Sequence, residues 1–227
     1  MTEIELIPAA TALLVRDGAD GVETLMLRRN SKIAFGGMWV FPGGSVDPED
    51  KRDTHEESAR IAAVREIEEE TQLQVDADHL VPWSYWEPPA RPTQQGSGPI
   101  RRFATWFFAC PAPAGDVTID MGEIHEHRWL TPAAALDLRR QGEIEIVPPT
   151  WITLTQLSRH GSVEAAMTWA RSAPTREFCT RPIGKDPMTL AWAGDEAYPG
   201  DGAGAAGDRN RLVMHESEWE YTTTLTD

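Results

Sequence analysis

The chain has 227 residues, of which 41% are hydrophobic and nine are tryptophan, and its formal net charge is −15. This length and composition allow a sizeable core in one large domain and do not favour disorder. The negative charge argues against nucleic acid or an anionic membrane as a partner held by general electrostatic attraction. An anionic substrate would therefore need a local site built from metal ions or a few arginines.

The cysteines and the N-terminus predict the cellular setting. Cys110 and Cys179 form neither a CxxC pair nor a Cys/His cluster, so reduced thiols are expected, without zinc or redox chemistry. The first residues lack a basic leader, and no apolar run approaches the ~20 residues of a membrane span. We expect a soluble, cytoplasmic protein, and leave a homodimer open.

Runs rich in β-branched, aromatic and aliphatic residues predict strands along the first two thirds of the chain. The first two are separated by turn residues and predict a hairpin. The predicted strands are 9–15, 22–27, 80–86, 103–110 and 126–130.

Capping signals predict the helices. Thr54 followed by Glu57 fits a capping box, so one helix is expected from about residue 55 to residue 71. Thr131-Pro132 starts a short helix that stops near Gly142, and residues 150–160 predict another. Strands and helices alternate without the tandem repeat of a doubly wound sheet, so we expect an α/β (α+β) fold with a mixed sheet flanked by helices.

The C-terminal third carries less regular signals. Residues 173–211 are rich in Pro, Gly and Asp and predict irregular chain, while 211–214 and 219–224 could form a terminal hairpin. We expect a main domain over 1–147 and a helical or irregular extension over 148–227 that packs on it. The Pro-rich loop 87–99 is either a lid or a simple connection.

The acidic run at residues 65–70 is the strongest signal for chemistry. At about 100° per residue, Glu69 and Glu70 lie at about 300° and 40° from Glu66, so the three share one edge of the helix, whereas Glu68 lies near 200°. Adjacent carboxylates repel one another unless a cation neutralises them, and oxygen ligands select Mg²⁺, Mn²⁺ or Ca²⁺. A solvated acidic face is the alternative, but the spacing behind a Gly-Gly loop favours a metal site.

The segment from Gly44 onward resembles the Nudix box, G-x5-E-x7-R-E-U-x-E-E-x-G-U, where U is a bulky aliphatic residue. The second half matches at Arg65, Glu66, Ile67, Glu69, Glu70 and Leu73. The first half is stretched: Asp50 stands at the required distance from Gly44, and Glu57 at the required distance from Arg65, so either acid could take the first Glu position. Gln72 replaces the last Gly of the box. That position suits a left-handed residue that ends the helix, and a non-glycine residue in this conformation costs on the order of 1 kcal/mol.

The resemblance implies an α/β/α sandwich that hydrolyses the diphosphate bond of a nucleoside diphosphate linked to another group. It implies Mg²⁺ or Mn²⁺ as the cofactor and a small nucleotide-type molecule as the partner. By carry-over, Glu69 and Glu70 are metal ligands, Glu66 is a ligand or orients water, and Arg65 positions a box glutamate. A backbone carbonyl of Gly43 or Gly44 is expected to complete the coordination.

Residues outside the box extend the predicted site. The family often places another acid before a Trp-Leu run, and here Glu123 or Glu126 could be that ligand or base. Four arginines could bind phosphates, because the guanidinium group offers a bidentate fork. These arginines are Arg28, Arg29, Arg101 and Arg102.

The residues around the loop suggest the substrate. The stretch 25–50 is similar to the longer branch of the family related to acyl-coenzyme A diphosphatases, so coenzyme A or acyl-coenzyme A leads. A nucleoside triphosphate, ADP-ribose or a nucleotide sugar is the rival substrate, and a catalytically weak nucleotide-sensing module is the rival function. Four aromatic residues could stack an adenine or lie in the core, namely Trp83, Tyr85, Trp86 and Trp106.

Overall fold

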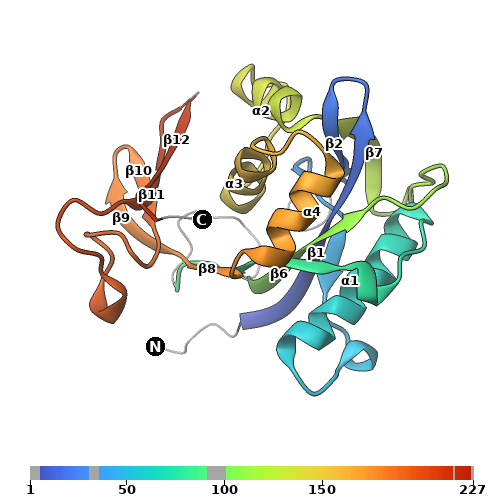
Figure 1. Ribbon diagram of the computed structural model, residues 1–227, viewed down its shortest axis with the longest axis horizontal. Coiled ribbons are helices and arrows are strands. Elements are labelled where there is room, and N and C mark those ends of the chain that lie inside the picture. Colours follow the sequence, from blue (N-terminus) through green and yellow to red (C-terminus); the bar gives the residue numbers. More distant parts are fainter. Residues whose placement is uncertain (1–5, 31–35, 91–100, 217, 226–227) are drawn as a thin grey trace.

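The computed structural model describes residues 6–30, 36–90, 101–216 and 218–225. Its main element is an eight-stranded mixed sheet in the order β3-β2-β1-β6-β5-β8, with β4 paired to β1 and β7 to β2 (Figure 1). The strands are β1 (Leu6–Gly18), β2 (Gly21–Arg29), β3 (Trp39–Val40), β4 (Gly43–Ser45), β5 (Val81–Glu87), β6 (Arg102–Pro111), β7 (Ile124–Leu130) and β8 (Arg176–Cys179).

The sheet confirms the predicted strands and the mixed topology. Strands β1 and β2 form the predicted antiparallel hairpin, and Gly21 closes its turn with a φ of 115° that favours glycine. Strand β6 runs parallel to β1 and antiparallel to β5. Most of the loop predicted over 87–99 lies outside the described residues.

Helix α1 (His55–Thr71) has the predicted bounds. The Thr54 hydroxyl accepts a hydrogen bond from the Glu57 amide, and the Glu57 carboxylate accepts one from the Thr54 amide, which completes the capping box. At the other end Gln72 adopts the left-handed conformation, with a φ of 58°. The helix therefore ends as the box pattern requires, although a glycine is missing there.

The two faces of the sheet carry separate cores, because side chains alternate along each strand. Residues Ala12 and Leu14 of β1 face α1 and pack on Ala62 and Ile67. Residue Leu13 faces the other way, into a core with residues from α2 (Pro132–Arg140), α3 (Pro148–Leu157) and α4 (Val163–Ser172).

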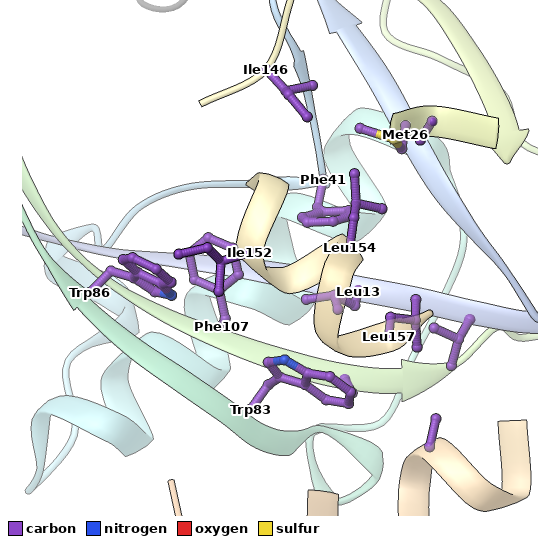
Figure 2. Close-up of a cluster of buried hydrophobic side chains, with 14 of the residues drawn as sticks. Leu13, Met26, Phe41, Trp83, Trp86, Phe107, Ile146, Ile152, Leu154 and Leu157 are labelled. Carbon is purple, nitrogen blue, oxygen red and sulfur yellow. The ribbon is translucent and has the colours of Figure 1, made fainter. Parts of the chain in front are cut away.

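Figure 2 shows this second core. Phe107, Trp83 and Trp86 lie opposite Ile152 and Leu157 of α3 (Figure 2). Trp83 and Trp86 are only 2% and 3% exposed, so they belong to the core rather than to an exposed stacking surface. Side chains from beyond residue 147, such as Ile152 and Leu157, thus lie in the same core as side chains of the main sheet.

The prediction of irregular chain over 173–211 was wrong for most of residues 176–191 and is confirmed for residues 192–209, which contain only the short 3-10 helix η3 (Gly200–Gly202). This segment contains β8, which extends the main sheet beside β5, and two strands of a second, four-stranded antiparallel sheet. The second sheet consists of β9 (Arg181–Lys185), β10 (Met188–Ala191), β11 (Asn210–Met214) and β12 (Trp219–Thr223), of which the last two confirm the terminal hairpin. In Figure 1 it lies at one end of the molecule, in orange and red.

Tertiary contacts, which leave no periodic signal in the sequence, order this segment. The buried carboxylate of Asp195 accepts hydrogen bonds from the amides of Ala197 and Asn210 and pairs with Arg211. Phe178 of β8 stacks on Trp86 of the main sheet, with ring centroids 4.0 Å apart.

None of the helices in the described residues combines the length and the apolar composition that a membrane span requires.

Candidate active site

Gly43 and Gly44, the first two residues of β4, lie against two carboxylates of the box. The amide of Gly43 donates a hydrogen bond of 2.9 Å to Glu70 Oε2. A Cβ on Gly44 would lie 2.3 Å from Glu66 Oε1, so only a glycine allows this carboxylate to lie so close to the strand. Strand β4 and helix α1 are therefore fitted to each other.

Arg65 organises the acidic edge of α1. Its Nη2 lies 2.8 Å from Asp50 Oδ2 and 2.9 Å from the carbonyl oxygen of Ser45. Its Nη1 lies 2.8 Å from Glu66 Oε1 and 2.9 Å from Glu69 Oε2. One guanidinium group thus joins the loop before the helix to two of the predicted metal ligands.

The pairing also decides which acid stands at the first Glu position of the box. Asp50 ends the short 3-10 helix η1 (Pro48–Asp50), and its buried side chain contacts Arg65. Glu57 instead caps α1 through Thr54. Asp50 therefore fills the position, and the extra residues lie between it and α1. The spacing of Asp50 from Gly44 was the signal for this position in the sequence. Nothing in the sequence indicated that the Ser45 carbonyl would contact Arg65.

Burial perturbs the ionisation of these acids. Burial raises the pKa of Glu70 to about 8, against the lowering effects of the Gly43 amide and of Arg29. Burial also raises the pKa of Glu66, although Arg65 opposes the shift. Burial would raise the pKa of Asp50 too, but hydrogen bonds from Arg65 and the Asp47 amide outweigh it and hold that pKa below its usual value.

Arg29 links Glu123 to Glu70 and Gly43. Arg29 Nη2 lies 3.0 Å from Glu123 Oε2, and Nη1 lies 3.6 Å from Glu70 Oε1. Nη1 also lies 3.4 Å from the carbonyl oxygen of Gly43. The structure therefore joins these predicted site residues, which are far apart in the sequence.

The other predicted residues lie in different surroundings. Glu126 pairs with Arg128 at 2.7 Å and lies 3.9 Å from Arg28, along neighbouring strands β7 and β2. Arg102 is 6% exposed and donates hydrogen bonds to the carbonyls of Pro88 and Pro89. Arg101, the residue before β6, is exposed.

The donor set fits a hard divalent cation, although its side chains are not gathered around one. Within the part of the chain that the structure describes, no three acidic, histidine or cysteine side chains converge to hold an ion. Glu66 and Glu69 are held by Arg65, and Glu69 is 59% exposed. However, Glu70 Oε1 is buried without a hydrogen bond, and all the predicted donors are oxygens, which Mg²⁺ and Mn²⁺ prefer.

The family model of the NUDIX domain matches residues 6–157, about two thirds of the chain. The chain belongs to the Nudix family. Among curated proteins it is similar to a CTP pyrophosphohydrolase of Escherichia coli, with 28% identity over 136 residues that cover 59% of this chain and 82% of that protein. Its fold is similar to that of a NUDIX hydrolase from Alicyclobacillus acidocaldarius, with a TM-score of 0.66 and 23% identity over 76% of this chain and 100% of the other.

The family match gives the kind of enzyme. The chain is a Nudix hydrolase, acting on the pyrophosphate bond of nucleoside diphosphate-linked substrates. The stretched part of its Nudix box lies between Asp50 and α1 and leaves the contact between Gly44 and Glu66 intact.

Proposed function

We propose that this Nudix hydrolase depends on Mg²⁺ or Mn²⁺, with coenzyme A or acyl-coenzyme A as the first substrate to test. The observation that carries the metal dependence is the carboxylate of Glu70. One of its oxygens is fixed by the Gly43 amide and the other is buried without a hydrogen bond, at a site whose remaining donors are also oxygens. Such a group needs a cation when it is ionised.

The proposed ligands are Glu66, Glu69 and Glu70, with the carbonyl of Gly43 as a further donor. A divalent ion there would neutralise charge on the diphosphate and lower the pKa of a water for in-line attack. The Glu69 side chain is 59% exposed beside Arg65, so it has room to reach an ion while it stays next to Arg65.

The side chains around the ligands divide the remaining work. Arg65 positions Glu66 and Glu69 by pairing with both while Asp50 holds it in place. Glu123 shares Arg29 with Glu70, so it is the better of the two candidate acids for receiving a proton from the attacking water. Glu126 is engaged with Arg128 on the neighbouring stretch of β7.

Two substrate classes have separate support. Coenzyme A or acyl-coenzyme A is favoured by the sequence around the glycine loop, which resembles that branch of the family. A nucleoside triphosphate is favoured by the similarity to the CTP pyrophosphohydrolase. ADP-ribose and nucleotide sugars contain the same diphosphate chemistry and belong in the same assay.

The test is hydrolysis of a panel of coenzyme A, acetyl-coenzyme A, CTP and ADP-ribose with Mg²⁺ or Mn²⁺, with products identified by mass. Coenzyme A cleavage would release 3′,5′-ADP and phosphopantetheine, whereas CTP would give CMP and pyrophosphate. Glu69→Gln and Glu70→Gln, singly and together, should abolish turnover without unfolding the protein, and Glu68→Gln is the matched control on the same helix. Full activity in the double variant would refute the ligand assignment. No turnover by the parent protein would favour the nucleotide-sensing alternative.

A further inference from the structure

The guanidinium group of Arg29 lies among the oxygen atoms of the proposed metal site. It reaches the Gly43 carbonyl at 3.4 Å, Glu70 Oε1 at 3.6 Å and Glu123 Oε2 at 3.0 Å. The side chain is only 16% exposed, so its charge is poorly screened by solvent. Two of these acceptors, the Gly43 carbonyl and Glu70, would serve both this organic cation and a divalent ion.

These contacts leave Arg29 incompletely satisfied. Two of the three are longer than the roughly 2.7–3.2 Å of a good N–H···O hydrogen bond. Arg29 Nε and Glu70 Oε1 are both buried without a hydrogen-bond partner, and a buried polar group that lacks one is destabilising. A ligand that offers more acceptors can therefore draw this guanidinium away from Glu70 at little cost.

We propose that Arg29 couples metal binding to substrate binding, an inference that rests on the proposed function. Without substrate, Arg29 competes with the divalent ion for Glu70 and the Gly43 carbonyl and weakens metal binding. A diphosphate provides oxygens that a guanidinium pairs with in bidentate fashion, so its binding turns Arg29 from the carboxylates toward the phosphates. Metal and diphosphate then bind with positive coupling, which is reciprocal by linkage.

The neighbouring residue provides a matched control. Arg28 has the same charge and lies on the same strand, but its Nη1 is 3.9 Å from Glu126 and its side chain is 44% exposed. Removing either arginine changes the net charge equally. Of the two arginines, Arg29 is the one whose contacts in the described structure include the proposed metal donors Glu70 and Gly43.

The experiment is calorimetric titration of the full chain with Mn²⁺ in the absence of nucleotide, for the parent protein, Arg29→Gln and Arg28→Gln. Arg29→Gln should bind Mn²⁺ about tenfold more tightly than the parent, and Arg28→Gln should stay within about twofold. A second titration, with the non-hydrolysable α,β-methylene-ADP at saturating Mn²⁺, should show about tenfold weaker binding to Arg29→Gln. A merely structural role of Arg29 would weaken both ligands, so the opposite signs identify competition.

Equal Mn²⁺ affinities for Arg29→Gln and Arg28→Gln would overturn the proposal while leaving the proposed function intact. Absence of Mn²⁺ binding to both the parent protein and Arg29→Gln would overturn both. If Arg29→Gln does not fold, Arg29→Lys keeps the charge and loses the planar fork. It should then bind α,β-methylene-ADP several-fold more weakly with an almost unchanged Mn²⁺ affinity, and unchanged binding of both ligands would refute the coupling.

Discussion

Replacing Asp50 by Asn tests which acid supports Arg65. The Asp50 side chain is 3% exposed, pairs with Arg65 at 2.8 Å and accepts a hydrogen bond from the Asp47 amide. Removing one partner of a buried pair costs 3–5 kcal/mol, and because Arg65 is 25% exposed we expect about 2–3 kcal/mol here. Glu57→Gln makes the same chemical change but keeps a side chain that suits the capping box, so it should cost under about 0.5 kcal/mol.

Urea unfolding followed by tryptophan fluorescence gives both free energies of unfolding. With a slope of about 2–3 kcal/mol per molar, Asp50→Asn should lower the midpoint by about 1 M and leave the slope unchanged. The variant should also lose hydrolytic activity at least about tenfold, because Arg65 would no longer hold Glu66 and Glu69 in place. Glu57→Gln should retain parent activity.

The pH dependence provides an independent check on the same residue. The folded-state pKa of Asp50 lies below its ordinary value of 3.8, so its stabilising effect is complete above that pH and is lost as the pH falls through the folded-state pKa. The stability difference between parent and Asp50→Asn should therefore be constant above about pH 5 and narrow below about pH 4. If Glu57→Gln proves the more damaging variant, or if the difference for Asp50→Asn widens in acid, the assignment of Asp50 is wrong.

Three further changes have defined outcomes. Gly44→Ala should displace the Glu66 carboxylate, because the added Cβ would lie 2.3 Å from it. This variant should reduce kcat about 100-fold with little change in the urea midpoint. The control Gly161→Ala places its Cβ in open space and should leave kcat unchanged. Gln72→Gly should raise the free energy of unfolding by about 0.5–1 kcal/mol, measured in urea, because the left-handed position favours glycine. Asp195→Asn should destabilise the second sheet by about 3 kcal/mol. Strands β10 and β11 should then undergo hydrogen exchange before the main sheet does. Uniform exchange across both sheets would contradict this.

The sequence by itself determined the local elements and the type of chemistry. Helix α1 begins and ends where the capping box and the left-handed residue predict, because both signals act through hydrogen bonds between residues close in sequence. The spacing of Glu66, Glu69 and Glu70 likewise follows from helical geometry alone. These features need no knowledge of the rest of the chain.

Tertiary structure decided the features that depend on long-range contacts. The choice of Asp50 over Glu57 required the position of Arg65 relative to the loop, and the meeting of Arg29, Glu70 and Glu123 required the pairing of β2 with β7. The strands within 173–211 are too short for a periodic signal and are ordered by the buried Asp195 network and by aromatic contacts with the main sheet. Sequence spacing thus fixed which carboxylates share one edge of the helix, while packing fixed which arginine neutralises each of them.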